Sequence, residues 1–364
     1  MPSFDIVKES HPSESFRVKQ TLDRFEIKEH VIKERFVGEL KIPDEWNIGL
    51  IIGHSGSGKT TIAKELFGEF IYTNNYYSPS VIDDMPKTKN VEDIQKMFNS
   101  VGFSSPPSWL KPYSVLSNGE KMRVDLAAAL LSGNEIIIFD EFTSVVDRQV
   151  AKIGSLCTQK TVRRNNSKFI AVSCHYDIEE WLMPDWVFDV NEMKMKYSTR
   201  RYLRQPELEF RIIKTKEKDY IWGIFGKYHY LSHILNKACD MFVIMHNDIP
   251  CGMCAVLHLV SPHVKNGKRI HRTIIHPDYQ GVGIGHKLSN FVAEYYLSRG
   301  LRVFSTTTNP AFTNSRLNDG KWKLKRQGRT SNIQGPKVKS NSCNRITLSW
   351  EYIGDQMSKS KKPN

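Results

Sequence analysis

Residues 50–61 have the types and spacing that suit phosphate chemistry. Gly53, Gly58, Lys59 and Thr60 occupy every fixed position of the pattern G-x-x-x-x-G-K-[ST]. Glycines let backbone N–H groups turn inward around phosphate oxygens, and the helix that follows presents its positive end to the same anion. Lys59 is expected to reach the β- and γ-phosphates, and the Thr60 hydroxyl to hold Mg²⁺. The stretch therefore predicts a nucleoside triphosphate site.

Further polar residues follow two apolar runs that are typical of buried parallel strands. Asp140 and Glu141 end the run 135–141, and His175 ends the run 168–175. We expect Asp140 to hold Mg²⁺, Glu141 to orient and deprotonate the attacking water, and His175 to contact the γ-phosphate. The stretch 116–120, Leu-Ser-Asn-Gly-Glu, begins a predicted helix and offers a second helix N-terminus to phosphate.

Together these motifs resemble the ATP-binding cassette (ABC) family over residues 30–190. The corresponding motifs are Walker A at 53–60, the signature at 116–120, Walker B at 136–141, the D-loop at 144–147 and the switch histidine His175. The resemblance implies ATP and Mg²⁺ as ligands, and an ATP-dependent homodimer in which the signature of one copy closes on the ATP held by the other. The ATP-binding residues are then Gly53, Ser55, Gly56, Ser57, Gly58, Lys59, Thr60, Thr61, Ser117 and Gly119, with Thr60 and Asp140 on the metal.

The chain departs from the ABC pattern between Walker A and the signature. This stretch is short for the family, residues 81–84 occupy the region of the usual Q-loop glutamine, and Gln95 lies inside a predicted helix. The glutamine and the helical subdomain of the family couple to membrane domains, so the sequence disfavours a transporter subunit. Phe25 or Phe36 is a candidate for stacking on adenine.

A second glycine-rich loop, 280–285, follows a predicted strand and precedes a predicted helix 286–298. Its successive N–H groups make a cradle for pyrophosphate, and it lacks the Lys–Thr pair of a Mg-nucleotide site. With the His-Pro-Asp-Tyr before it, the loop resembles the Q/R-x-x-G-x-G/A motif of the GNAT acyltransferase family, and the order of strands fits over 206–353. The resemblance implies that acetyl-CoA or another acyl donor is bound by Gln280, Gly281, Gly283, Ile284 and Gly285.

The sequence motifs identify the residues for acyl transfer less clearly than those of the acyl-CoA loop. Many GNAT proteins carry a tyrosine acid shortly after the strand that follows the loop helix, but 309–315 has no tyrosine and Ser315 stands about where it is expected. The segment 228–230, Tyr-His-Tyr, lies on the predicted early helix that shapes the acceptor site in the family. An imidazole can act as a base near neutral pH, so His229 joins Ser315 as a candidate catalytic residue. This segment and the missing tyrosine also distantly resemble phage Mom-type DNA-modifying GNAT relatives.

Charge is distributed unevenly along the chain. The net charge is +13, and residues 206–364 hold 25 Lys and Arg against 11 Asp and Glu. Such a basic region favours a polyanionic partner, most simply DNA or RNA, although a solvated surface gives the same count. The segment 321–329 carries five positive charges, and Trp322 within it is a candidate for stacking on a base.

The fold class expected is α/β, with a P-loop ABC-type ATPase domain at 1–200, an α+β GNAT-like acyltransferase domain at 206–355, and a disordered tail at 356–364. The boundary is placed in the stretch 191–208, which includes 200–206. Residues 1–12 are expected to fray, and the runs 16–19 and 35–40 to form an antiparallel hairpin.

Composition predicts a soluble, cytoplasmic protein. No run of 18 apolar residues occurs, the start lacks the features of a signal peptide, and the six cysteines are scattered, which favours a reduced compartment and no membrane partner. Cys251 and Cys254 form a C-x-x-C pair on a predicted strand, where positions three apart point to opposite faces, so a metal site is disfavoured.

Taken together, the sequence predicts an ATP-hydrolysing ABC-type ATPase whose GNAT-like domain transfers an acyl group, with nucleic acid as the acceptor. Two alternatives stay open. One is an ATP-gated protein or small-molecule N-acetyltransferase, in which acyl transfer needs no nucleic acid. The other is a non-catalytic, ATP-driven nucleic-acid-binding clamp, in which no acyl group moves.

Overall fold

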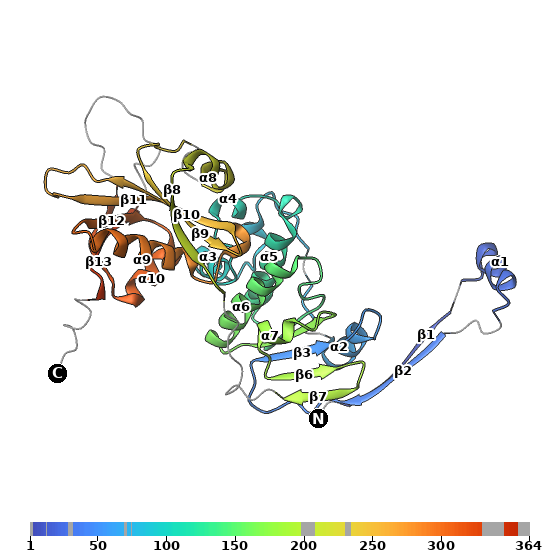
Figure 1. The fold of residues 1–364 in the computed structure, drawn as a ribbon. Coiled ribbons are helices and arrows are strands. Elements are labelled where there is room, and N and C mark those ends of the chain that lie inside the picture. Colours follow the sequence, from blue (N-terminus) through green and yellow to red (C-terminus); the bar gives the residue numbers. More distant parts are fainter. Residues whose placement is uncertain are drawn as a thin grey trace. The chain divides into compact units, whose positions relative to one another are not determined.

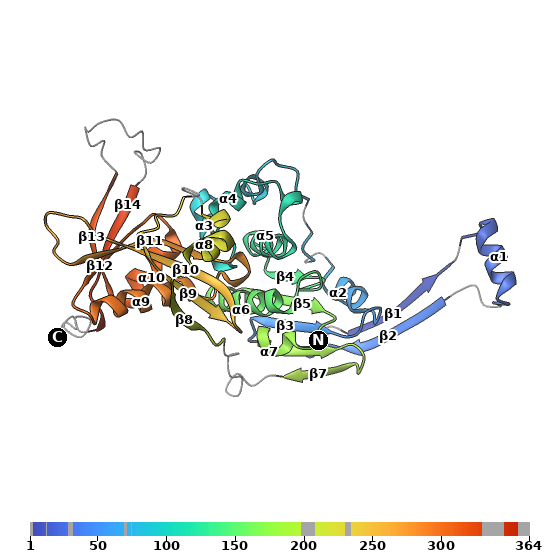
Figure 2. The same cartoon turned by 45° about the horizontal axis from the view of Figure 1, so that its top comes forward.

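The computed structural model describes residues 3–11, 13–27, 32–68, 71–73, 75–197, 208–229, 234–329 and 346–355 (Figure 1, Figure 2). Contacts divide the chain into two compact units, one of Met1–Asn75 with Ala128–Pro206 and one of Tyr76–Ala127 with Glu207–Asn364. The second unit thus includes Tyr76–Ala127, which lies inside the ATP-binding domain expected at 1–200. Of the predicted boundary 191–208, residues 198–207 lie outside the described residues, as does the predicted tail 356–364.

A five-stranded sheet of order β4-β5-β3-β6-β7 forms the core of the first unit. Its first four strands pair in parallel, and β7 runs antiparallel to β6. The strands read as unbroken apolar runs because a parallel sheet is covered on both faces. The strands are β3 (Ile48–Ile52), β4 (Ile136–Phe139), β5 (Lys168–Ser173), β6 (Trp186–Asp189) and β7 (Lys194–Tyr197), and the helices are α2 (Lys59–Phe67), α6 (Arg148–Arg164) and α7 (Ile178–Leu182).

The start of the chain forms an antiparallel ribbon of β1 (Ser3–Ser10) and β2 (Ile32–Glu39), with α1 (Phe16–Arg24) at its far end (Figure 1). Two predictions are therefore wrong. Residues 1–12 contain a paired strand, and residues 16–19 begin a helix. The N-cap Ser15 explains the second error, because its hydroxyl accepts a hydrogen bond from the Val18 N–H and so starts a helix.

Short helices make up the first part of the second unit. They are η2 (Val81–Asp84), α3 (Val91–Ser100), α4 (Pro106–Trp109), η3 (Tyr113–Val115) and α5 (Asn118–Leu131). The helix predicted at 91–101 is confirmed, and the Asn90 side chain caps it by accepting from the Asp93 N–H. Phe98, Phe103 and Trp109 pack edge-to-face or tilted and form the aromatic centre of this segment.

The rest of the second unit is built on a seven-stranded sheet of order β13-β14-β12-β11-β10-β9-β8. All neighbours pair antiparallel except β11 and β12. The strands are β8 (Arg211–Thr215), β9 (Asp240–His246), β10 (Ile249–His258), β11 (Gly267–Ile275), β12 (Arg302–Thr307), β13 (Trp322–Arg329) and β14 (Ile346–Tyr352). The helices are α8 (Lys218–Phe225), η5 (Gly226–Tyr228), η6 (Pro277–Tyr279), α9 (Ile284–Leu297) and α10 (Pro310–Asp319).

Helices α8 and α9 cover opposite faces of this sheet. Met241 and Val243 of β9 pack in one cluster with Phe225 of α8. Phe242, which lies between them and points to the other face, contacts the rings of Tyr295 and Tyr296 of α9. The period-two alternation of apolar residues in β9 thus assigns one helix to each face.

Candidate functional site

The loop between β3 and α2 has the backbone shape that its glycines allow. Gly56 and Gly58 adopt φ of 81° and 89°, in the left-handed region. Gly58 is the N-cap of α2 and no side chain caps it, so the N–H groups of the first turn face the loop. A Cβ on Gly53 would lie 2.6 Å from Ser57 Oγ, so the loop closes tightly. These features together form an anion cradle at a helix start.

Lys59 and Thr60 each have a polar partner beside the phosphate loop. The Lys59 side chain is buried, and its Nζ donates to the His54 carbonyl of the loop at 2.6 Å. The Thr60 hydroxyl donates to Asp140 Oδ1 at 3.2 Å, so the two expected metal ligands, one at the start of α2 and one just after β4, contact each other. Hydroxyl and carboxylate oxygens are the hard ligands that Mg²⁺ prefers. The residues present therefore fit ATP with Mg²⁺.

The remaining ATPase candidates lie at the same edge of the sheet. Glu141 follows β4, is exposed, and has φ of 53°, and its N–H donates to Asp140 Oδ1 at 2.9 Å. His175 follows β5, is half-buried, and its N–H donates to Ser173 Oγ at 3.2 Å. Because β4, β5 and β3 are parallel neighbours, their carboxyl ends bring these side chains to the edge that carries the phosphate loop.

Phe36 is the better placed of the two aromatic candidates for adenine. A Cβ on Gly58 would lie 2.6 Å from the Phe36 ring, so this ring packs on the phosphate loop. Phe25 follows α1 and is 68% exposed. The sequence left the two open, and contact with the loop favours Phe36.

The signature turn starts α5 with a reciprocal capping box. The Ser117 hydroxyl accepts from the Glu120 N–H at 3.3 Å, and the Glu120 carboxylate accepts from the Ser117 N–H at 3.0 Å. Glu120 also accepts from Ser108 Oγ at 2.8 Å, which ties the turn to α4. The cap fixes the backbone of the expected phosphate contacts Ser117 and Gly119.

The second glycine loop repeats the backbone pattern of the first. Gly281 and Gly283 adopt φ of 90° and 83°, and Gly283, with ψ of 8°, is the uncapped N-cap of α9. The corresponding values at Gly58 are 89° and 7°. A Cβ on Gly283 would meet no atom within 4 Å, so the space over the loop is open. Ile284 and Gly285 follow in the first turn of α9 and supply further N–H groups.

Strands β11 and β12 separate beside this loop. Among the described residues they pair only from Gly267 to Ile270 of β11, whereas β11 continues to Ile275 and there pairs with β10 alone. Residues 271–275 therefore present an open strand edge toward the gap. An extended chain with amide groups, such as the arm of an acyl-CoA, can pair with such an edge. The loop and the edge together fit an acyl-CoA.

The two predicted catalytic residues of this unit have different surroundings. His229 follows η5 instead of lying on a helix, its side chain is buried, and Arg272 Nη1 lies 2.7 Å from its Nδ1 and 2.9 Å from its Nε2. Ser315 lies on α10 with a half-buried side chain. Tyr230 lies outside the described residues.

The structure brings together a second pair that the sequence did not single out as catalytic. Tyr228 Oη lies 3.0 Å from His276 Nε2, and both side chains are partly buried next to the loop. Burial lowers the pKa of His276, opposed by Asp278 and assisted by the positive charges of Lys227 and Arg123. A neutral imidazole bonded to a phenol can accept or return a proton. The only sequence signal was the position of His276 just before the loop.

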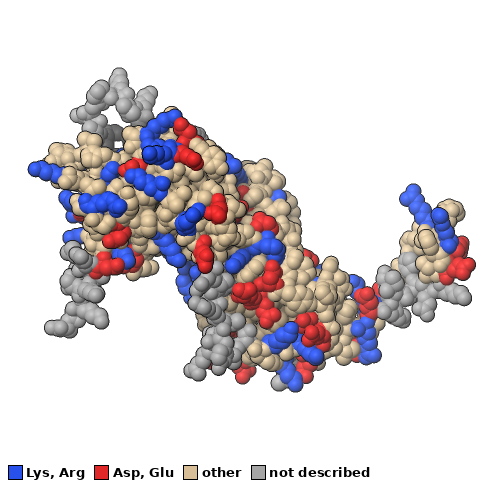
Figure 3. Space-filling model, viewed as in Figure 1, with Lys and Arg blue, Asp and Glu red and all other residues tan. Residues whose placement is uncertain are grey.

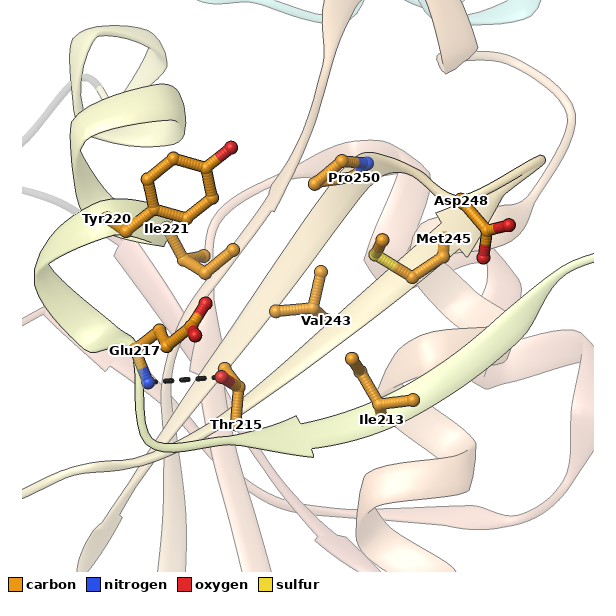
Figure 4. A pocket seen from close by; sticks show the side chains of 9 residues that line it. All are labelled: Ile213, Thr215, Glu217, Tyr220, Ile221, Val243, Met245, Asp248 and Pro250. Atoms are coloured by element: carbon orange, nitrogen blue, oxygen red, sulfur yellow. Dashed lines mark hydrogen bonds between the residues drawn. The ribbon is translucent and has the colours of Figure 1, made fainter.

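A pocket of about 170 Å³ opens between α8 and the β8 edge of the sheet (Figure 4). Its floor is apolar and includes Ile213 and Val243, while Glu217 and Tyr220 stand on the α8 side. Asp248 at the opposite rim is paired with Arg211 at 2.7 Å. The walls thus suit a ligand with an apolar body and a cationic group.

The basic segment 321–329 forms β13, at the edge of the sheet. Stacking of Trp322 on a base is a wrong prediction, because this side chain is 4% exposed and its Nε1 donates to Asn290 Oδ1 at 2.7 Å. Lys325 pairs with Glu351 at 3.0 Å, which neutralises part of the charge. Figure 3 shows basic side chains spread over this part of the second unit and interrupted by acidic ones.

The C-x-x-C pair is part of the core. Cys251 and Cys254 are buried on β10, and burial raises the pKa of each thiol to about 12. Within the described parts of the chain, no group of three or more His, Cys, Asp or Glu is arranged to hold a metal ion. The same parts contain no helix long and apolar enough to cross a bilayer.

The structure thus joins a P-loop nucleotide-binding fold to a mixed sheet with an acyl-donor type of loop. Comparison with known proteins agrees with both halves. Residues 176–316 match the model of the acetyltransferase (GNAT) family. The N-terminal half matches ABC-type transporter ATPases, and the two matches are consistent with an ABC-type ATPase fused to a GNAT domain.

The individual matches are distant. The energy-coupling factor transporter ATP-binding protein EcfA1 of Listeria monocytogenes is 28% identical over 184 residues, which cover 39% of this chain and 64% of the relative. That of Mycoplasmopsis pulmonis is 28% identical over 180 residues, covering 37% and 65%. The chain therefore spans less than two thirds of the length of these relatives.

Solved structures of both classes show low overall similarity. The ribosomal-protein-S18-alanine N-acetyltransferase from Escherichia coli has 12% identity and a TM-score of 0.31, covering 40% of this chain and 95% of its own. A dimeric ATP-binding cassette bound to ADP and phosphate has 14% identity and a TM-score of 0.39, covering 54% and 97%.

Proposed function

We propose that this protein is an ATP-hydrolysing acyltransferase that works as a homodimer and transfers an acyl group to nucleic acid. The observation that carries the proposal is the pair of glycine loops. Gly58 and Gly283 share one left-handed N-cap conformation, but only Gly58 is followed by a lysine and a threonine that meets a carboxylate. The first loop suits a Mg-triphosphate, and the second suits a pyrophosphate without Mg²⁺.

In the ATPase half, ATP supplies a γ-phosphate that water can attack. Lys59 and the loop N–H groups would hold the phosphates, and Thr60 with Asp140 would hold Mg²⁺. Glu141 stands one residue beyond Asp140 and would orient the attacking water. The signature turn at Ser117 would close on the nucleotide of a second copy, which is why we propose an ATP-dependent homodimer.

In the second half, an acyl-CoA supplies an acyl group as a thioester. The 281–285 loop would hold its pyrophosphate, and the open β11 edge its amide-containing arm. His276 Nε2 can take the proton of Tyr228 Oη or return it, so this pair can move a proton in either direction. The pair supplies the phenol that the stretch 309–315 lacks.

The choice of nucleic acid as acceptor is supported by charge. Residues 206–364 carry 25 basic and 11 acidic side chains, an excess that attracts polyanions. The pocket in Figure 4 favours a second candidate acceptor, a primary amine of a small molecule or a protein. Glu217 at its wall would attract the ammonium, and the apolar floor would hold an alkyl chain.

The test is a transfer assay with the purified full-length protein. We would incubate it with Mg-ATP, isotopically labelled acetyl-CoA and either DNA, RNA, a lysine-rich peptide or a polyamine, and weigh the digested products. The Glu141→Gln variant, which should bind ATP without hydrolysing it, is the control for the need for hydrolysis. The proposal expects labelled nucleosides. Label on the peptide or polyamine alone would select the second candidate, and label on none of them would refute both.

A further inference from the structure

The loop expected to bind acyl-CoA is attached to the helical segment that carries the signature. Tyr76–Ala127 and Glu207–Asn364 belong to one compact unit. Ser104, between α3 and α4, donates its N–H to Gln280 Oε1 at 2.9 Å. The other end of the same amide, Gln280 Nε2, donates to the Ile275 carbonyl at 2.9 Å. The first residue of the loop motif therefore joins the helical segment to the end of β11.

Gly102 shows that the backbones approach closely at this point. A Cβ on Gly102 would lie 2.6 Å from the Gln280 carbonyl oxygen, and its φ of 86° is left-handed. Only glycine meets both demands without strain. The contact is thus built into the backbone on the helical side and does not depend on flexible surface side chains.

Arg123 of α5 connects the signature turn to the residues just before the acyl-CoA loop. Its side chain is 1% exposed. Its Nη1 donates to the carbonyl of the signature residue Gly119 at 3.2 Å, and its Nη2 donates to the Asp278 carbonyl at 3.1 Å. One planar, buried guanidinium therefore spans the signature turn and the residue two positions before Gln280. A lysine could not span both carbonyls, because an ammonium is a point charge on a flexible stem.

We propose that Arg123 is a positioning residue that links the acyl-CoA loop to the signature turn, so that ATP bound against the signature and acyl-CoA bound at the loop strengthen each other. The inference rests on the proposed function, since it assumes both ligands. When a nucleotide orders the signature turn, the Gly119 carbonyl becomes fixed. The Arg123 guanidinium, which bonds both carbonyls, then also fixes Asp278. The reverse holds by linkage, so each ligand must change the affinity of the other by the same factor.

A further observation places Arg123 near the chemistry. Its positive charge is among those that lower the pKa of His276, so a displacement of Arg123 also changes the electrostatic surroundings of the Tyr228–His276 pair. The same side chain therefore contacts the Asp278 carbonyl, just before the donor loop, and influences the proposed proton acceptor.

Isothermal titration of the full-length protein tests the link. The dissociation constant of acetyl-CoA is measured with and without the Mg²⁺ complex of the non-hydrolysable analogue AMP-PNP, and that of AMP-PNP with and without acetyl-CoA. We expect AMP-PNP to lower the dissociation constant of acetyl-CoA by about fivefold to a hundredfold, and acetyl-CoA to lower that of AMP-PNP by the same factor. Arg123→Gln should bring both factors to about one while AMP-PNP alone still binds.

Two further variants make the result specific. Arg123→Lys keeps a buried charge and serves if Arg123→Gln does not fold, and it too should lose the coupling. Arg299→Gln removes an exposed guanidinium that bonds the Tyr295 carbonyl on α9, and it should keep the coupling. An unchanged coupling factor in both Arg123 variants would overturn the role of Arg123. Acetyl-CoA that binds equally with and without AMP-PNP would overturn the link alone, and no acetyl-CoA binding at all would overturn the proposed function with it.

Discussion

Replacing Gly283 by alanine should weaken ligand binding at the second glycine loop while costing the fold little stability. Gly283 has φ of 83°, and a Cβ there would meet no protein atom within 4 Å. The protein itself therefore loses only the cost of holding alanine in the left-handed region, about 1–2 kcal/mol. The Cβ would stand where a pyrophosphate must approach the N–H groups of α9. Hydrogen bonds to a charged group contribute about 1.5–3 kcal/mol each, so losing one weakens binding by about tenfold to a hundredfold.

Gly300 provides a matched control within the same unit. It has φ of 72°, and its Cβ would also meet nothing within 4 Å, but it lies beyond the other end of α9. Gly300→Ala should therefore lower the melting temperature about as much as Gly283→Ala, by about 2–8 °C. Only Gly283→Ala should weaken the binding of acetyl-CoA.

The assay is a calorimetric titration of acetyl-CoA into both variants, with differential scanning calorimetry on the same samples. Equal loss of stability with a selective loss of affinity in Gly283→Ala is the expected result. The reasoning fails if Gly283→Ala binds acetyl-CoA as tightly as the unmodified protein, because the loop would then not hold the pyrophosphate. It fails as well if both variants lose affinity equally.

Three further predictions follow from other contacts. A Cβ on Gly49 would lie 2.1 Å from Trp186 Cζ2, so Gly49→Ala should destabilise the first unit by about 1–3 kcal/mol in urea denaturation. Burial opposes ionisation of Asp240, but hydrogen bonds from two lysines and a tyrosine outweigh it and hold its pKa below the usual range. Its contribution to stability is therefore present above about pH 4 and is lost as pH falls further, and Asp240→Asn should flatten this loss in acid titrations. Tyr228→Phe should lower kcat for acyl transfer by about 10²–10⁴-fold without weakening the binding of acetyl-CoA. Because the pKa of His276 is lowered, the rate of acyl transfer by the unmodified protein should persist below pH 6.5, the usual pKa of histidine.

Both glycine loops could be predicted from the sequence because each is a local feature. The spacing of glycines between a strand and a helix fixes the left-handed turns and the uncapped helix start without reference to the rest of the chain. The carboxylates after β4 could be predicted for the same reason, since an unbroken apolar run of that length is typical of a parallel strand that is covered on both faces. The fold class, an ABC-type ATPase followed by a GNAT-like domain, followed from these motifs.

The features that the sequence could not predict depend on contacts between distant segments. Tyr228 and His276 are separated by 48 positions, and Ser104 and Gln280 by 176. The hydrophobic periodicity of the sequence does not predict contacts between residues so far apart in the chain. Short local patterns were also ambiguous: the alternation at 16–19 fits a strand, but the cap at Ser15 starts a helix. Trp322 illustrates a third limit, because a tryptophan among lysines can be a surface ring or, as found here, a core residue.

The most direct test of the account is the requirement for both ligands in one reaction. Labelled acetyl-CoA is incubated with the full-length protein and nucleic acid, with Mg-ATP, with AMP-PNP or without nucleotide, and the label on purified nucleosides is measured by mass spectrometry. We expect label on the nucleosides with Mg-ATP, and at an acetyl-CoA concentration below saturation we expect less label with Gly283→Ala, because that variant binds acetyl-CoA more weakly. Nucleosides without label under every condition, from protein that binds both ATP and acetyl-CoA, would contradict it.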